Sequence, residues 1–126
     1  MNNGVVVHYF DAFRRIFMIE QAIFYIENNF QNKITLDELA EKTNFNSQYF
    51  CRLFKRETGK TAVEYLNICR LEQAVNLLCE NDERLIDVAF DCGFNSYGYF
   101  VRKFKSYIGC TPSEYKKKIA KRKGHL

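Results

Sequence analysis

The segment TAVEYLNICRLEQAVNLLCE (residues 61–80) lies between two stretches of sequence that match each other closely. The stretch before it is FNSQYFCRLFKRETGKT (residues 45–61), and the stretch after it is FNSYGYFVRKFKSYIGCT (residues 94–111). Matching residues such as Arg52 and Arg102 are fifty positions apart, and one residue is inserted in the turn of the second copy. Repetition at this level of detail indicates two copies of one supersecondary unit.

The segment between the repeats has the pattern of one long helix. Thr61 and Glu64 have the Thr-x-x-Glu spacing of a capping box, and no glycine or proline interrupts the residues that follow. Its apolar residues recur near helical spacing: Leu66, Cys69, Ala74, Leu77 and Leu78. At 1.5 Å per residue this helix would be roughly 30 Å long, which is close to the ~34 Å of one turn of B-DNA.

Each repeat has the pattern of a helix-turn-helix motif. In the first copy Phe50, Leu53 and Phe54 stand at i, i+3 and i+4, and we expect them to point together into a core. The side chains expected on the opposite faces are Gln48, Arg52 and Lys55 in the first copy and Gly98, Arg102 and Lys105 in the second. A short helix, a tight turn and a second helix with a basic outward face together favour this motif.

Short polar residues mark the expected starts of the helices. Capping boxes are predicted at residues 35–38 and 111–114, the second with Pro112 at its first helical position. Ser47 and Ser96 are the predicted N-caps of the two helices that present basic faces.

The sequence therefore predicts an all-α fold of about seven helices, in which two helix-turn-helix subdomains are joined by a long central helix. The first subdomain covers residues 16–60, the connecting helix residues 61–80, and the second subdomain residues 81–122. For residues 1–15 the sequence leaves three interpretations, which are a tail, a linker and an extra turn of helix. Residues 123–126 are expected to form a C-terminal tail.

Positive charge is concentrated in the repeats and near the C-terminus. Residues 45–60 hold four Lys or Arg against one acidic residue, and residues 102–126 hold nine against one. Residues 61–95, in contrast, hold two against seven. This distribution is expected if the repeats face a polyanion such as DNA. On charge alone, a solvated basic face or a helical module that binds an acidic protein is an alternative.

The residues on the outward faces suit the chemistry of the DNA major groove. Arginine can contact the O6 and N7 atoms of guanine with two hydrogen bonds, and glutamine can do the same for adenine N6 and N7. Arg52 with Gln48, and Arg102 with Tyr97, are positioned for such contacts. The basic residues farther along the two helices, better placed for phosphates, are Lys55, Arg56 and Lys105.

The sequence offers little for catalysis or for a cofactor. His8 and His125 lie in the predicted tails, and the chain has no phosphate-binding glycine loop and no nucleophile paired with a base. Five cysteines are an odd number without metal-binding spacing, so we expect structural thiols. No apolar run approaches the ~20 residues that span a bilayer, and the N-terminus lacks a leader pattern. We expect a cytoplasmic protein that is not an enzyme and that binds no metal, cofactor or membrane.

Residues 34–116 resemble the DNA-binding domain of the AraC/XylS family of bacterial transcription regulators. The resemblance rests on ITLDELA, FKRETGKT, GFNSYGYFVRKFKSYIG and TPSEY. It implies two helix-turn-helix units whose recognition helices enter successive major-groove segments on one face of double-stranded DNA. It further implies transcription regulation, for which we expect activation with repression as the open alternative, and RNA polymerase is a candidate partner. We expect this domain to bind DNA as a monomer unless a further domain dimerises it.

The contact positions of the family can be carried over residue by residue. The base-reading positions fall at Gln48, Cys51 and Arg52 in the first repeat and at Tyr97, Gly98, Tyr99 and Arg102 in the second. The expected phosphate-contacting residues are Ser47, Lys55, Arg56, Ser96 and Lys105.

Overall fold

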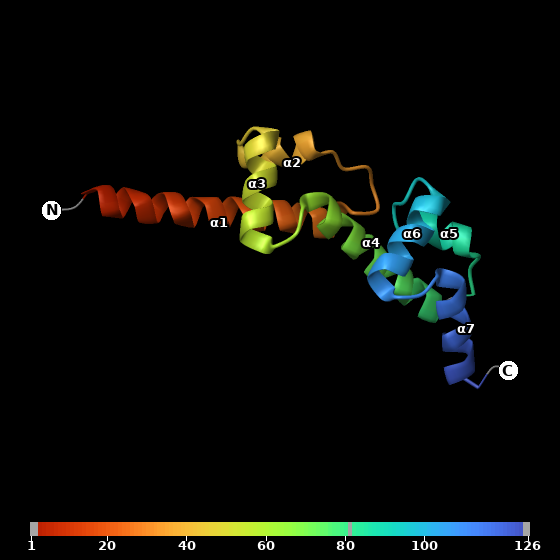
Figure 1. Cartoon of the computed structure of the whole chain (residues 1–126). Helices are drawn as coiled ribbons and strands as arrows, with labels where there is room; N and C mark the ends of the chain where they lie inside the picture. The colour runs from red at the N-terminus through yellow and green to blue at the C-terminus, as the bar shows by residue number, and fades with distance from the viewer. Residues whose placement is uncertain (1–2, 81, 125–126) are drawn as a thin grey trace. The chain divides into compact units, whose positions relative to one another are not determined.

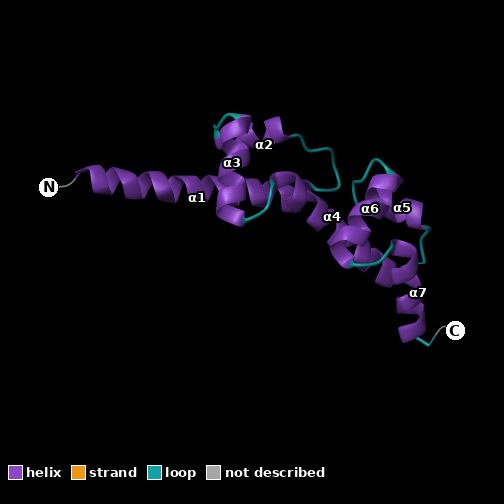
Figure 2. Ribbon diagram, in the orientation of Figure 1, coloured by secondary structure: helices purple, strands orange, loops and turns teal. Residues whose placement is uncertain are grey.

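The computed structural model describes residues 3–80 and 82–124, with side chains from residue 11 onward. In this part of the chain there are seven α-helices and no strand (Figures 1 and 2). The helices are α1 (Asn3–Asn29), α2 (Leu36–Thr43), α3 (Ser47–Thr58), α4 (Ala62–Glu80), α5 (Leu85–Asp91), α6 (Tyr97–Ile108) and α7 (Pro112–Arg122). The predicted all-α fold of about seven helices is therefore confirmed.

The chain divides into two compact units, and the boundary between them falls within α4. Unit 1 comprises Met1–Asn29 and Ile34–Leu66, and unit 2 comprises Phe30–Lys33 and Asn67–Leu126. Unit 1 thus holds α1, α2, α3 and the start of α4, whereas unit 2 holds the rest of α4 with α5, α6 and α7. Each unit contains one copy of the repeated sequence.

Unit 1 has a core formed by the inward faces of its helices. The buried apolar side chains are Ile19, Ala22 and Ile26 of α1, Leu39 and Ala40 of α2, Phe50, Leu53 and Phe54 of α3, and Ala62 and Leu66 of α4. The Phe54 ring also meets the Tyr65 ring edge-on, with 6.0 Å between the ring centroids. Burying one large apolar side chain contributes about 1.5–3 kcal/mol, so this core accounts for the position of α3 against α1.

The first helix starts earlier than Ile16, where the sequence predicted it. Of the three alternatives for residues 1–15, the structure shows helix from Asn3 onward. Phe13 and Phe24 are 72% and 65% exposed on one side of α1, while the opposite side of the helix is buried in unit 1. Because apolar residues occupy both sides, the sequence lacks the single apolar stripe that marks the extent of an amphipathic helix.

Unit 2 repeats the same construction around the second half of α4. Its core consists of Leu71, Ala74 and Leu78 of α4, Val88, Ala89 and Cys92 from the α5 region, and Phe94, Phe100 and Phe104. The Phe104 ring continues the cluster to Tyr115 of α7, with 5.8 Å between the ring centroids. The Lys116 ammonium also donates a hydrogen bond of 2.9 Å to the Glu83 carbonyl, which attaches α7 to the segment before α5.

The predicted N-cap of α6 is confirmed, and that of α3 is wrong by one residue. Ser96 caps α6, and its hydroxyl accepts a hydrogen bond of 3.2 Å from the Tyr99 N–H. Asn46 caps α3 instead of Ser47, and its Oδ1 accepts a hydrogen bond of 2.8 Å from the Tyr49 N–H. Asparagine and serine are about equally good N-caps, so two adjacent candidates could not be separated from sequence.

The three predicted capping boxes differ in how completely they form. At Thr61 the hydroxyl accepts a hydrogen bond of 3.1 Å from the Glu64 N–H. At Thr111 both halves are present, and the hydrogen bond from the Thr111 N–H lowers the pKa of the Glu114 carboxyl. At Thr35 the hydroxyl accepts from the Glu38 N–H at 3.1 Å, which is the first half of a box. The Glu38 carboxylate instead accepts a hydrogen bond from the Tyr25 hydroxyl at 3.4 Å, because α1 lies within its reach.

Gly93 is placed where no other residue fits without a change of structure. Its φ of +104° is in the left-handed region, and a Cβ atom built there would lie 2.4 Å from the Phe30 carbonyl oxygen. Arg70 of α4 holds that carbonyl in place, since its Nε donates to it at 2.7 Å and its Nη2 donates to the Asn32 carbonyl at 2.9 Å. Unit 2 therefore depends on a glycine at the end of α5.

Replacing Gly93 by alanine should destabilise unit 2 strongly. Gly109→Ala is the matched control, since Gly109 has a similar φ of +99° but nothing within 4 Å of the added Cβ. The control should cost only the left-handed backbone penalty of about 1–2 kcal/mol, whereas Gly93→Ala should cost about 3–5 kcal/mol. Urea denaturation of the two variants would measure this difference, and equal losses would show that the close approach to Phe30 is not limiting.

Candidate nucleic-acid interface

Helix α3 has one face in the core of unit 1 and one face in solvent, as the sequence predicted. Phe50, Leu53 and Phe54 are at most 1% exposed, so the helix cannot turn without breaking the core. Gln48, Arg52, Lys55 and Arg56 are exposed, and Cys51 and Ser47 are half-buried beside them. The core thus fixes which side chains this helix offers to a ligand.

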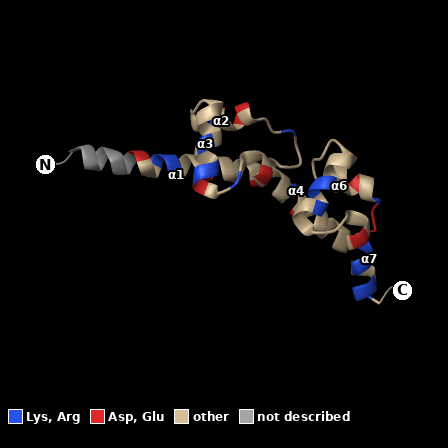
Figure 3. Ribbon diagram, viewed as in Figure 1, with Lys and Arg blue, Asp and Glu red and all other residues tan. Residues whose placement is uncertain are grey.

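Helix α6 is divided in the same way within unit 2. Phe100 and Phe104 are fully buried, and the exposed residues on the other side are Gly98, Arg102 and Lys105. Arg52 and Arg102 therefore occupy the same position on the outward faces of their own units, as the repeat predicted. Figure 3 shows basic residues on α3, α6 and α7.

A shallow groove in unit 1 brings several predicted contact residues together. It runs between the start of α2 and the outward face of α3, and it is lined by Thr35, Leu36, Asp37, Ser47, Gln48, Cys51 and Arg52. Sequence reasoning identified the four residues from α3 but not the three at the start of α2. The signal available for those three was the helix-turn-helix motif itself, which sets the first helix across the second.

The starts of α3 and α6 suit a phosphate group. Neither helix carries an acidic residue in its first turn, and the free N–H groups at a helix N-terminus attract anions. Ser47 is the first residue of α3, and Ser96 precedes α6. The Ser96 oxygen already accepts a hydrogen bond from the Tyr99 N–H, so Ser96 would contact a phosphate by donating its hydroxyl hydrogen.

The basic residues farther along the helices are available for phosphates. Lys55 and Lys105 lie in the last turns of α3 and α6 and are exposed. Arg56 makes a pair with Glu57 at 3.3 Å, with 62% and 31% of the two side chains exposed. A pair this open to water is worth at most about 1 kcal/mol, so Arg56 can exchange it for a phosphate.

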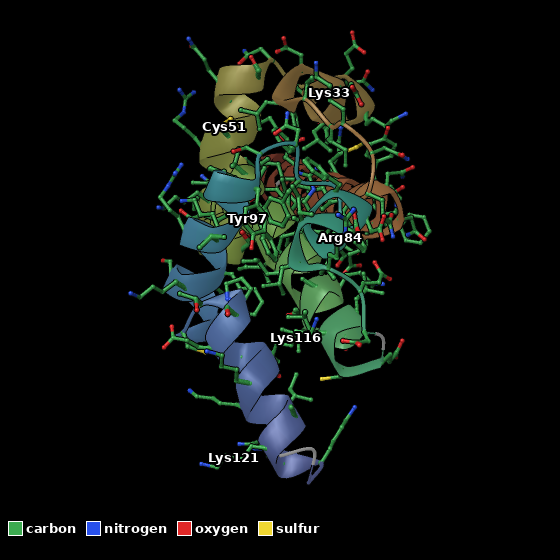
Figure 4. The ribbon with its side chains drawn as sticks, turned by 90° about the vertical axis from the view of Figure 1, so that its right-hand side faces the viewer. Lys33, Cys51, Arg84, Tyr97, Lys116 and Lys121 are labelled. Atoms are coloured by element: carbon green, nitrogen blue, oxygen red, sulfur yellow. The ribbon has the colours of Figure 1, made fainter. Side chains whose placement is uncertain are left out.

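The two predicted tyrosine contacts differ in direction. Tyr97 lies in the first turn of α6 (Figure 4), is half-buried, and packs on Phe100 with 6.0 Å between the ring centroids. Tyr99 is turned toward α4, where its hydroxyl accepts a hydrogen bond of 2.8 Å from the Asn67 amide. The Tyr99 hydroxyl therefore points toward α4, whereas Arg102 stands on the outward face of α6.

Two cationic groups lie close to the Tyr99 ring. The Arg102 guanidinium carbon lies 5.9 Å from the ring centroid, and the Lys103 ammonium lies 5.4 Å from it. These are distances of cation–π contacts. Asn67 and Lys103 were not among the predicted site residues, since neither stands on the outward face of a repeat.

All five cysteines lie in the described part of the chain, and no disulfide joins any of them. Burial raises the pKa of the Cys92 thiol to about 12, so it stays protonated at neutral pH. Between residues 3 and 124, leaving aside residue 81, no group of three or more His, Cys, Asp and Glu side chains is arranged to hold a metal ion. In the same residues, no helix has the length and apolar character that a bilayer-spanning segment needs.

Comparison with known proteins identifies the domain. Residues 39–118 match the family model described as a helix-turn-helix domain. The chain is 38% identical over 94 residues to the HTH-type transcriptional activator RhaS of Mannheimia succiniciproducens, covering 75% of this chain and 35% of RhaS. It is 31% identical to the transposon Tn10 TetD protein of Escherichia coli, covering 91% of this chain and 83% of TetD. The chain thus spans about a third of RhaS but most of TetD.

Solved structures with the same fold include two regulator domains. A probable AraC family transcriptional regulator from Rhodopseudomonas palustris has a TM-score of 0.75 at 29% identity, covering 81% of this chain and 96% of that chain. The DNA-binding domain of the global transcriptional factor AdpA, solved in complex with a target DNA, has a TM-score of 0.78 at 23% identity. That second match covers 86% of this chain and 97% of the AdpA domain, and it shows a shared fold.

Proposed function

Because this chain belongs to the AraC/XylS family of helix-turn-helix transcriptional regulators, we propose that it reads two neighbouring major-groove segments of double-stranded DNA with α3 and α6. The observation that carries this proposal is the matched pair Arg52 and Arg102. Both are exposed, and each stands opposite two fully buried phenylalanines of its own unit. A helical module that binds an acidic protein through its basic faces would not need arginines at equivalent positions of a repeat.

In this proposal the base contacts come from the outward faces of the two helices. Arg52 and Arg102 each donate two hydrogen bonds to a guanine, and Gln48 contacts an adenine. Cys51 borders the groove beside Arg52, where it can touch a thymine methyl group. Tyr97 and Gly98 lie in the first turn of α6, where the former offers a ring and a hydroxyl and the latter permits close approach of the DNA.

The phosphate contacts fix the position of each helix in its groove. Ser47 and Ser96 at the helix starts, and Lys55, Arg56 and Lys105 farther along, are the proposed residues. Such contacts carry no sequence information, but they set the register in which the arginines meet the bases.

The proposed spacing of the two contacts comes from α4. Its 19 residues at 1.5 Å rise make a helix of roughly 28 Å, comparable with the ~34 Å turn of B-DNA. One copy of the chain carries both recognition helices, so a monomer is sufficient for this mode of binding. Since RhaS is named an activator, we further propose that the bound protein activates transcription and contacts RNA polymerase.

Removing either arginine should weaken binding and relax specificity at a different part of the site. Arg52→Ala and Arg102→Ala should each cost about 1–3 kcal/mol of binding free energy, because each removes a two-hydrogen-bond base contact. Arg84→Ala is the control, since Arg84 is exposed but pairs with Asp87 outside both recognition helices. Selection of sites from random DNA with each variant would measure the effect, and loss of preference at the same base pairs in both variants would contradict two separate contacts.

Binding should weaken steeply with salt, because contacts between lysine or arginine and phosphate release counterions. Lys55→Ala and Lys105→Ala should each reduce the slope of log affinity against log salt concentration by about 1. Lys33→Ala, an exposed lysine outside both recognition helices, is the matched control. Titrations at several salt concentrations would provide the slopes. Unchanged slopes in Lys55→Ala and Lys105→Ala would remove these residues from the phosphate set.

Two alanines inserted between Leu66 and Asn67 should abolish specific binding if α4 is continuous on DNA. The insertion adds ~200° of helical rotation between the two units, which would turn one recognition helix away from its groove. Affinity for the selected site should fall to the non-specific level, on the order of 10³-fold weaker. Circular dichroism would verify that both units remain folded. Retained affinity would show that α4 does not set the spacing.

A further inference from the structure

We propose that Tyr99 and Asn67 are positioning residues that hold Arg102 ready for its base, and that the described side chains of unit 1 form no equivalent arrangement for Arg52. The inference rests on the proposed base contact of Arg102. It assigns Tyr99 a different role from the one carried over from the family, and it brings in Asn67, which lies on α4 rather than on a recognition helix.

The first step is the anchoring of the Tyr99 hydroxyl. Asn67 is one of the few buried polar side chains in the chain's described part, with 7% of its surface exposed. Its Nδ2 donates a hydrogen bond of 2.8 Å to the Tyr99 oxygen. A buried amide that loses its partner is destabilising, so both side chains are constrained to keep this contact. The hydroxyl end of Tyr99 is therefore fixed to α4.

The second step is the anchoring of the ring. The Tyr99 centroid lies 6.2 Å from that of Phe94, a residue of the unit 2 core, with an angle of 52° between the rings. Tyr99 is thus held at its hydroxyl by Asn67 and along its ring by Phe94. A side chain held at two points presents a fixed surface to whatever lies above it.

The third step is the contact between this surface and the cation. The Arg102 guanidinium carbon lies 5.9 Å from the Tyr99 centroid, one helical turn along α6. The Arg102 Nη1 atom is also close to Gly98, since a Cβ built there would lie 3.7 Å from it. The guanidinium therefore rests between the Tyr99 ring and the start of α6. Because an unsupported arginine loses rotamer freedom when it is fixed on DNA, support before binding lowers the cost of the base contact.

Among the side chains of unit 1 from residue 11 onward this arrangement is absent, although the unit carries the matching tyrosine. Tyr49 packs edge-on against Phe45, with 4.9 Å between the ring centroids. The hollow beside it is lined by Asp11, Arg14 and Arg15 of α1, whereas the Tyr99 hydroxyl in unit 2 meets the neutral amide of Asn67. In the described part of the chain Arg52 makes no cation–π contact, whereas Arg102 does. Among the described side chains, the Arg102 guanidinium is thus supported by an aromatic ring before DNA binds, whereas the Arg52 guanidinium is not.

The test measures discrimination at the base pairs that each arginine reads, first identified with Arg52→Ala and Arg102→Ala. Tyr99→Leu removes the ring and should reduce discrimination at the Arg102 base pairs by about two- to fivefold, the factor that an exposed cation–π contact provides. Discrimination at the Arg52 base pairs should not change. Tyr49→Leu is the matched control and should leave discrimination at the Arg52 base pairs as it is.

Two further variants separate the ring from its anchor. Asn67→Leu keeps a side chain of similar size but removes the hydrogen bond, and Tyr99→Phe keeps the ring but removes the oxygen. Both should lower discrimination at the Arg102 base pairs less than Tyr99→Leu does, and both keep the test decisive if Tyr99→Leu does not fold. If both variants keep full discrimination at the Arg102 base pairs, the positioning role proposed for Asn67 is overturned.

A measurement without DNA distinguishes failure of this inference from failure of the proposed function. In the free protein, the NMR signal of the Arg102 Nε–H should be shifted by the Tyr99 ring and should move in Tyr99→Leu but not in Tyr49→Leu. An unmoved signal, or unchanged discrimination in Tyr99→Leu when Arg102→Ala relaxes it, would overturn the positioning role. Unchanged discrimination in Arg102→Ala would instead overturn the proposed base contact of Arg102, and with it the function of the support.

Discussion

The burial of two phenylalanines in each recognition helix is the constraint on which the rest of the structure depends. Phe50 and Phe54 in α3, and Phe100 and Phe104 in α6, are fully buried and stand one helical turn apart. A helix with such a pair on one side must turn the residue midway between them to the opposite side. That residue is an arginine in both units, so the exposure of the cations is a result of core packing. The same contacts that stabilise each unit also define its candidate DNA-binding face.

Most of the fold could be predicted from the sequence because its signals are local. The repeat, the apolar spacing and the capping residues identified α2 to α7, and the Thr111 box formed as expected. Two details were wrong for physical reasons. Ser47 lost the N-cap position to Asn46, which has equivalent capping chemistry. The start of α1 was missed because its two apolar sides hide the periodicity that a half-buried helix normally shows.

The candidate site was predictable only where helical geometry decides it. The exposed positions Gln48, Arg52, Arg102 and Lys105 follow from 100° per residue once the core face is known. The direction of Tyr99 does not follow from this rule, since it depends on a hydrogen bond to a residue 32 positions away. The contribution of the start of α2 to the groove in unit 1 likewise depends on packing between elements. Long-range contacts thus give different roles to residues that local sequence patterns do not distinguish.

The way in which Arg70 holds the loop after α1 has a consequence for how this domain can vary in evolution. The arginine binds the main-chain oxygens of Phe30 and Asn32, and it contacts neither the Gln31 nor the Lys33 side chain in these hydrogen bonds. Every residue type supplies a main-chain carbonyl, so these two hydrogen bonds tolerate substitution of the loop residues as long as the length of the loop is kept. Arg70 and Gly93, by contrast, constrain each other in evolution, because a Cβ atom at position 93 would collide with the Arg70 side chain.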